Sequence, residues 1–328
     1  MAITSLSRRG AALAAALSAA LALTACGSDD DTTGDATATT ATTHSVTADN
    51  GTIEVPAAPQ RVATIGNTTQ PFIDLGGKPV AVTTVRDSTL ELLPDDQQAT
   101  YKAATNIGDQ DIDLEKLAGL KPDLILVQID DAGFKEIEKQ LTSIAPTVSW
   151  SLDTEWKAFA DAIAAAANTD PALSQQKAEF AAKVTKIKET YRTIIEDTSF
   201  VDVSRGQFND PGTFYIADIG CSEIGRDDVG LTLPQADAGK DPLAYTSLPF
   251  EQISQLTEYD VITYPVDAQG RPMPDFEPVI ETSTWKALPA VTSGRALGLF
   301  CPGNNSYGQV IRYLDSLDSA LAKLPAQQ

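Results

Sequence analysis

Residues 171–196, PALSQQKAEFAAKVTKIKETYRTIIE, carry a helical pattern that decides the fold of this chain. The large apolar side chains recur at steps of three and four, which is the spacing of one helical face: Phe180, Val184, Ile187, Tyr191, Ile194 and Ile195. The preceding run Asn168-Thr169-Asp170-Pro171 supplies a polar cap and a proline in the first turn. The predicted helix would be about 39 Å long at 1.5 Å per residue, long enough to reach from one lobe to another.

The chain before this helix alternates short apolar strands with short helices. We expect strands at 62–65, 79–85, 123–127 and 147–150, and helices at 70–75, 113–120 and 134–144. Asp113 is a suitable N-cap for the second of these helices, and Lys121-Pro122 ends it. Such alternation is typical of parallel strands joined by crossover helices, so residues 50–154 are predicted to form an α/β lobe.

The chain after the long helix shows the same alternation. Strands are expected at 213–219, 259–264 and 295–300, and helices at 250–256 and 307–324. Apolar residues at Trp156, Phe159, Ile163 and Ala166 add a helix before the long one. The predicted fold class is therefore α/β, with two mainly parallel lobes (50–154 and 199–328) joined through a helical segment at 155–198 that contains one long backbone helix.

The first 25 residues have the layout of a secretory signal peptide. Arg8 and Arg9 precede an apolar run at 11–23, and small residues stand directly before Cys26. This junction resembles a bacterial lipobox, which implies cleavage before Cys26 and acylation of its thiol. The alternative is an ordinary cleaved signal that leaves Cys26 as a free thiol. Residues 26–49 are rich in Thr, Asp, Ala and Gly, and we expect them to form a flexible tether after the acylated cysteine.

Charge and histidine content exclude several classes of function. The formal net charge is −21, which argues against binding to nucleic acid or directly to anionic lipid headgroups. The single histidine, His44, falls in the expected tether, so a histidine-based catalytic triad or a multi-histidine metal site is excluded. No glycine-rich phosphate-binding loop is present. We expect neither enzymatic activity nor a resident cofactor.

Short stretches in a fixed order carry a family resemblance: 51–56 (GTIEVP), 59–62 (PQRV), 75–82 (LGGKPVAV), 114–125 (LEKLAGLKPDLI), 143–148 (SIAPTV), 259–262 (YDVI) and 285–291 (WKALPAV). Together they resemble the class III substrate-binding proteins of siderophore, heme and cobalamin importers. The resemblance implies two lobes joined by a rigid helix, with the ligand in the cleft between them. It also implies a binding protein on the extracytoplasmic face of the cell membrane that is held there by the lipid on Cys26. Its partners would be a ferric siderophore, with iron present only inside the bound chelate, and an ABC permease.

Two other functions stay open from the sequence. One is a heme or corrinoid carrier of the same fold, in which Tyr215, Tyr264 or Tyr307 would be available to ligate iron. The lack of a second histidine, and a single methionine after the signal (Met273), disfavour heme. The other is a lipid-anchored sensory or interaction module that uses the fold without a permease.

The resemblance also implies two permease-docking carboxylates, one on each lobe. Glu115 stands eight residues before Asp123, and Glu251 stands nine before Asp260, which are the spacings of the family. Pro249 occupies the position where the family usually has a serine cap. The alternative is that both are solvated carboxylates favoured at a helix start by the helix dipole.

Ligand-binding candidates follow from the rule that open parallel sheets bind ligands beyond the carboxyl ends of their strands. They are Asn67, Thr68, Arg86, Gln128, Trp150, Ser222, Arg226, Tyr264, Asn304 and Tyr307. An anionic catecholate or carboxylate chelate would need Arg86 and Arg226, whereas a hydroxamate complex needs mostly aromatic contact and a few hydrogen-bond donors. Neighbouring aspartates offer both arginines a surface salt bridge instead. Trp150 and Tyr307 could equally serve as core or rim packing instead of contacting a ligand.

Cys221 and Cys301 each follow a predicted strand, so both should lie at the same end of the second lobe. In an oxidising compartment such a pair is expected to form a disulfide. The alternative is two buried thiols.

Overall fold

The computed structural model describes residues 42–109, 111–205, 212–234 and 247–324. The predicted signal peptide, Cys26 and the first part of the predicted tether therefore lie outside the described residues. All described residues belong to one compact unit that starts at Ala41.

The N-terminal lobe is built on a five-stranded parallel sheet. Its strand order is β5-β4-β3-β6-β7, with β3 Val62–Gly66, β4 Ala81–Val82, β5 Thr105–Asn106, β6 Leu124–Gln128 and β7 Thr147–Ser149. The β3 and β6 strands run in register from Val62 opposite Leu124 to Gly66 opposite Gln128. Every residue of β6 is buried, as expected for a parallel strand covered on both faces.

Helices cover this sheet: α1 Thr69–Asp74, α2 Asp87–Leu90, α3 Asp95–Ala103, α4 Leu114–Gly119 and α5 Asp131–Ile144. The predicted cap at Asp113 is confirmed, because its carboxylate accepts a hydrogen bond of 2.8 Å from the backbone N–H of Lys116. The helices α2 and α3 and strand β5 were not predicted, because their short polar segments carry no apolar period.

An antiparallel hairpin precedes the sheet, formed by β1 Thr43–Ala48 and β2 Gly51–Pro56. The prediction that residues 26–49 form a tether is therefore wrong for its last residues. Residues 43–48 contain one large apolar side chain, Val46, too little to predict a strand, but it is buried in the core together with Val55 of β2. His44 likewise lies in β1 rather than in a tether, with its Nε2 2.9 Å from the carbonyl oxygen of Ala165.

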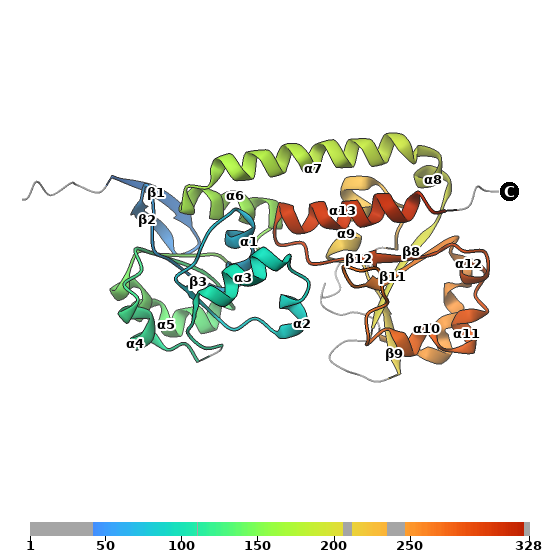
Figure 1. The fold of residues 1–328 in the computed structure, drawn as a ribbon, viewed down its shortest axis with the longest axis horizontal. Coiled ribbons are helices and arrows are strands. Elements are labelled where there is room, and N and C mark those ends of the chain that lie inside the picture. The colour runs from blue at the N-terminus through green and yellow to red at the C-terminus, as the bar shows by residue number, and fades with distance from the viewer. Residues whose placement is uncertain (1–41, 110, 206–211, 235–246, 325–328) are drawn as a thin grey trace, which may run out of the picture. The chain divides into compact units, whose positions relative to one another are not determined.

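Three helices connect the lobes: α6 Trp156–Ala167, α7 Asp170–Thr190 and α8 Arg192–Asp197. The predicted break is confirmed at Asn168, which adopts the left-handed conformation with φ of 55°. The predicted single helix over 171–196 is interrupted at Tyr191 (φ −113°, ψ 25°), where the chain turns toward the second lobe. The 21 residues of α7 still span about 31 Å, and Figure 1 shows α7 running beside α6 at one end and beside α13 (Tyr307–Leu321) at the other.

The C-terminal lobe holds a mixed five-stranded sheet in the order β10-β9-β8-β11-β12. Strands β8 (Phe200–Arg205), β11 (Val261–Val266) and β12 (Ala296–Phe300) are parallel, while β9 (Thr213–Ile216) and β10 (Ser247–Pro249) are antiparallel. The helices are α9 Cys221–Glu223, a π-helical turn η2 Ile224–Val229, a 3₁₀ helix η3 Phe250–Glu258, α10 Glu277–Ile280, α11 Ser283–Lys286, α12 Pro289–Thr292 and α13. The predicted disulfide is confirmed: Cys221 and Cys301 are bonded, with 6.0 Å between their Cα atoms.

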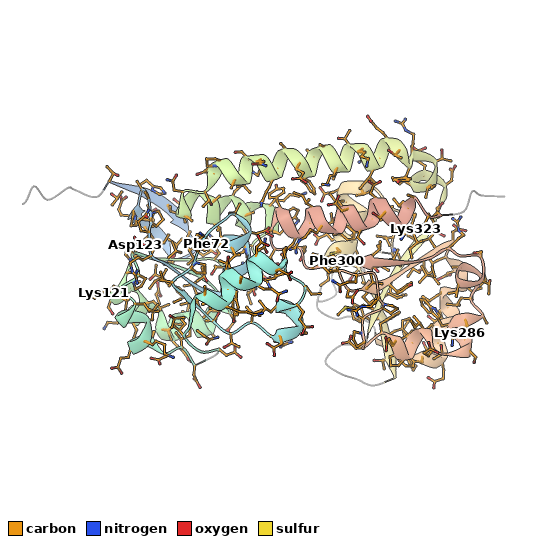
Figure 2. The ribbon with its side chains drawn as sticks, viewed as in Figure 1. Phe72, Lys121, Asp123, Lys286, Phe300 and Lys323 are labelled. Carbon is orange, nitrogen blue, oxygen red and sulfur yellow. A yellow bond between two sulfur atoms is a disulfide. The ribbon has the colours of Figure 1, made fainter. Side chains whose placement is uncertain are left out.

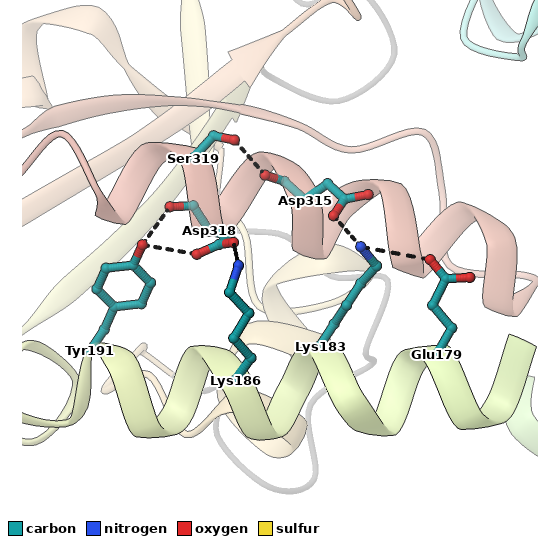
Figure 3. Close-up of polar contacts among 7 residues, drawn as sticks. All are labelled: Glu179, Lys183, Lys186, Tyr191, Asp315, Asp318 and Ser319. Atoms are coloured by element: carbon teal, nitrogen blue, oxygen red, sulfur yellow. Dashed lines mark hydrogen bonds and ion pairs between the residues drawn. The ribbon is translucent and has the colours of Figure 1, made fainter.

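The helical segment packs against both lobes. One continuous apolar cluster extends from Val46 of the hairpin through α6 and α7 to Leu321 of α13, with Phe72 among its buried members (Figure 2). A polar ladder fixes α7 against α13: Lys183 pairs with Asp315, and Lys186 approaches Asp318 to 2.6 Å (Figure 3). The Tyr191 hydroxyl donates to the same Asp318 carboxylate at 2.8 Å. The C-terminal half of α7 and the turn after it are therefore tied to the second lobe.

Candidate functional site: a cleft at the strand ends of both lobes

A cavity of about 870 Å³ opens beyond the carboxyl ends of the N-terminal sheet, and we call it the strand-end cavity. Asn67 follows β3, the segment 83–86 follows β4, and Ile129 and Asp130 follow β6. Because parallel strands end at one edge of a sheet, these loops converge. Asn305 of the C-terminal lobe also lines the cavity, so both lobes contribute to it.

A second cavity of about 730 Å³ lies between α2 and the C-terminal lobe, and we call it the interlobe cavity. Ser88, Glu91 and Leu92 line it from the N-terminal lobe. The opposite wall consists of Phe250 at the start of η3 and the turn after β11, with Asp267, Arg271, Met273 and Asp275 among its residues. A smaller cavity of about 200 Å³ extends it from Leu92 to Cys301. We refer to these three cavities together as the cleft.

The match to a known family model decides what kind of protein this is. The model described as "Periplasmic binding protein" matches residues 62–299, which include both lobes and the helical segment. This chain belongs to the periplasmic binding protein family. The family comprises binding proteins, and the two-lobed α/β architecture is the fold of its siderophore-binding structural neighbours.

Similar proteins come from several bacteria. The iron(3+)-hydroxamate-binding protein FhuD of Bacillus subtilis is 29% identical over 290 residues, covering 83% of this chain and 84% of its own. The siderophore periplasmic binding protein from the fuscachelin gene cluster of Thermobifida fusca superimposes with a TM-score of 0.71 at 24% identity, over 82% of this chain and 99% of its own. The catecholate-siderophore binding protein VctP of Vibrio cholerae gives a TM-score of 0.62 at 18% identity, over 86% and 99%.

Two of the predicted ligand-binding residues line the strand-end cavity. Asn67 is exposed directly after β3, and Arg86 is exposed at the N-cap position of α2. Arg86 forms no ion pair with any residue that the structure describes, so its guanidinium is available to a bound molecule. Both stay candidates for ligand contact.

Two further candidates from the same lobe are structural. The Thr68 hydroxyl is fully buried, lies 3.0 Å from the carbonyl oxygen of Leu126 and accepts from the backbone N–H of Ile65. Gln128 is buried too, and its Nε2 donates to the carbonyl of Ser151 at 2.9 Å. The strand-end rule located the correct loops, but it does not determine which side chains point into the cavity.

Three aromatic candidates pack into the protein rather than line the cleft. Tyr307 lies between Trp156 and Phe180, and burial raises the pKa of its hydroxyl to about 12. Tyr264 packs on Phe276 and Trp285. Trp150 meets Phe159 edge to face, with its Nε1 buried and without a hydrogen-bond partner, and it borders a separate cavity of about 570 Å³ beside α5.

The candidates near α9 and β12 also differ from prediction. Ser222 is buried and donates to the Asp202 carboxylate, whose pKa burial raises to about 6. Arg226 forms the salt bridge that the sequence offered as an alternative, since its Nε donates to Asp227 at 2.8 Å. Its Nη1 donates to the carbonyl of Asp218, so this guanidinium is occupied.

In the loop before α13, Asn304 is half-buried, and its neighbour Asn305 lines the strand-end cavity instead. Sequence reasoning missed the turn after β11, which contributes Arg271 and Met273 to the cleft. The strand-end rule would have found this turn if the predicted strand had been extended from Tyr264 to its observed end at Val266.

No tyrosine or histidine lines the cleft among the described residues. The described chain also holds no group of three or more His, Cys, Asp or Glu placed to bind a metal ion. Such a cleft can enclose an intact chelate, and among the usual axial ligands of heme iron its described residues offer only the thioether of Met273. Within the same described part, no helix has the length and apolarity needed to cross a membrane.

Glu115 and Glu251 both lie exposed in the first turn of their helices, α4 and η3. Neither forms an ion pair with a residue that the structure describes. Helix η3 packs against α11, and Figure 1 shows α4 and α11 on the side of the protein away from α7. The predicted docking role stays a prediction, and the geometry leaves both carboxylates free to meet a partner.

Proposed function

We propose that this protein captures a ferric siderophore in the cleft and delivers the intact complex to an ABC permease. The observation that carries the proposal is a cleft built from strand ends of both lobes, in a member of the periplasmic binding protein family, without a described tyrosine or histidine to ligate iron. Similar proteins named for iron(3+)-hydroxamate and catecholate siderophores support the choice of ligand. The protein performs no chemistry on its cargo.

The membrane attachment of the proposed carrier is a lipid on Cys26. The small residues before this cysteine support acylation, which would hold the protein on the extracytoplasmic face of the cell membrane. Cells that express the chain in labelled fatty acid should label the wild type and not Cys26→Ser. Release of the wild-type protein from membranes by salt alone would contradict the anchor.

Glu115 and Glu251 are the proposed docking residues, one on each lobe. Electrostatic contacts of this kind orient partners, so their removal should affect delivery rather than capture. The double change Glu115→Ala and Glu251→Ala is expected to abolish uptake of iron from the ferric siderophore and to leave the Kd of the purified protein unchanged. Glu189→Ala, an exposed carboxylate on α7, is the matched control. Normal uptake by the double variant would refute docking and favour a sensory or interaction module.

A fluorescence titration tests the ligand class. Ferric chelates should quench the emission of the protein in a saturable way, because iron complexes absorb in the near ultraviolet and visible range. Hemin and cobalamin should produce no saturable binding. Tight binding of hemin or cobalamin with no response to ferric chelates would replace the proposal by a heme or corrinoid carrier.

A further inference from the structure

The described residues that line the strand-end cavity carry an excess of carboxylates. Asp109, Asp111, Asp130 and Glu136 face a single cation, Arg86. Asp109, Asp111 and Glu136 are exposed side chains without an ion pair to a described residue, and Asp130 caps α5 by accepting from Gly133 at 2.9 Å. Each brings a formal negative charge to the cavity, and no lysine stands among the described residues that line it.

The interlobe cavity adds less to this excess. Glu91, Asp267 and Asp275 line it together with one cation, Arg271. The Arg271 guanidinium lies 2.6 Å from the Asp267 carboxylate, so the two charges neutralise each other. Of the other two carboxylates, Glu91 is exposed and forms no ion pair with a described residue, while Asp275 has a partner of its own. Within the described residues, Arg86 is thus the one guanidinium of the cleft without a paired carboxylate.

Ferric siderophores differ in net charge according to their donor groups. Iron(III) bound by three hydroxamates gives a neutral complex, which becomes cationic when the ligand also bears an ammonium group. Iron(III) bound by three catecholates carries three negative charges, and carboxylate chelates are anionic too. In a cleft that carries excess negative charge, an anionic complex is repelled by Coulomb forces while a neutral or cationic complex is not.

We propose that the cleft selects a ferric hydroxamate and rejects anionic ferric catecholates and carboxylates. The inference rests on the proposed siderophore function and deepens it. Uncharged donors near the strand ends, among them Asn67 and Asn305, suit the oxygens of a neutral chelate. Phe250, Leu92 and Met273 provide apolar wall. Similar proteins are named for both donor classes, so the choice is carried by the charges of this cleft.

The dependence of binding on salt gives the first test. Purified protein is titrated with a neutral ferric trihydroxamate, a cationic one and a ferric triscatecholate, at about 0.01 M and about 0.15 M salt, where the screening length falls from about 30 to about 8 Å. The neutral hydroxamate should bind at least tenfold more tightly than the catecholate at the lower salt. Salt should strengthen catecholate binding, weaken binding of the cationic hydroxamate and leave the neutral one unchanged.

Charge-neutralising variants give the second test. The double change Asp111→Asn and Glu136→Gln is isosteric and should raise the association constant of the catecholate about tenfold at about 0.01 M salt, with less than a twofold change for the neutral hydroxamate. Glu138→Gln is the matched control. Glu138 lies on the same helix as Glu136 but lines the separate cavity beside α5, so its effect should be smaller.

The outcomes separate this inference from the function on which it rests. Equal or tighter catecholate binding, or an unchanged catecholate affinity in the double variant, would overturn the hydroxamate inference and leave the siderophore function standing. Failure of every ferric chelate to bind, whatever its charge, would overturn both.

Discussion

Replacing Asp74 by alanine should loosen the two lobes from each other, because its carboxylate bridges them. Oδ1 accepts from Gln97 Nε2 at 2.7 Å within the N-terminal lobe, and Oδ2 accepts from Ser306 Oγ at 2.5 Å across the lobes. Ser306 is the N-cap of α13 and accepts in turn from the backbone N–H of Gln309. A Cβ at Gly308 would lie 2.2 Å from the same Oδ2, so the carboxylate sits against the first turn of α13.

The expected cost of this change follows from the two hydrogen bonds. A hydrogen bond to a charged group contributes about 1.5–3 kcal/mol, and water can replace part of it because Asp74 is half-buried. We expect Asp74→Ala to lower the free energy of unfolding by about 3 kcal/mol. Ser306→Ala removes the N-cap of α13 and the hydrogen bond to Asp74, and it should lower the free energy of unfolding by about 1–2 kcal/mol.

Urea denaturation of both single variants and the double variant measures the link between the lobes. Because Asp74 and Ser306 share one hydrogen bond, their effects should fall short of additivity by about 1–2 kcal/mol. The looser lobes should also weaken ferric-chelate binding, since a preformed cleft loses less conformational entropy. Glu189→Ala serves as the control and should change neither quantity. Strict additivity, or a cost for Asp74→Ala no larger than that of the control, would refute the bridging role.

Three further predictions concern the disulfide, a buried carboxylate and the cleft. Replacing Cys221 and Cys301 by alanine should lower the free energy of unfolding by about 4.5 kcal/mol, which is the loop-closure entropy for their separation of 80 residues. An unchanged midpoint in urea denaturation would contradict this prediction. Burial raises the pKa of Asp202 to about 6 from 3.8, so its ionised form destabilises the fold as pH rises from about 4 to above 6. Asp202→Asn should therefore gain stability relative to wild type by up to about 3 kcal/mol between pH 4 and pH 8 in urea denaturation, and a pH-independent difference would be the contrary result. Arg86→Gln should weaken ferric-chelate binding about tenfold. Arg226→Gln should leave this affinity unchanged, because the Arg226 guanidinium is paired within its own lobe. Equal effects of the two changes in the titration would show that Arg86 does not contact the chelate.

Those parts of the fold that depend on apolar period were predictable from the sequence. The strands around Val62–Gly66 and Leu124–Gln128 are buried on both faces and therefore form continuous apolar runs. The long helix was predicted from a stripe spaced by three and four. The turn of the chain at Tyr191 was not predicted, because the same apolar spacing continues through Ile194 and Ile195 into α8. Strand β8 escaped prediction because Asp202 interrupts its apolar run. Two of the hydrogen bonds to this carboxylate come from side chains in distant segments, Ser222 and Thr263.

The candidate site was predictable to the level of loops, not of side chains. The strand-end rule pointed to the segments at Asn67 and Arg86, which do line the strand-end cavity. It could not tell that Thr68, one residue further, turns inward to bond the backbone of β3 and β6. Arg226 was equally ambiguous, because the adjacent Asp227 competes with any ligand for its guanidinium. Such choices depend on side-chain direction, which the spacing of residues does not determine.

A titration of the purified protein with ferric siderophores shows whether the cleft binds a ferric hydroxamate. Protein fluorescence is recorded as a ferric trihydroxamate, a ferric triscatecholate and hemin are added separately at about 0.01 M salt. We expect saturable one-to-one quenching by the ferric hydroxamate, at least tenfold weaker binding of the catecholate, and no saturable response to hemin. Quenching by hemin alone, or by none of the three, would contradict this expectation.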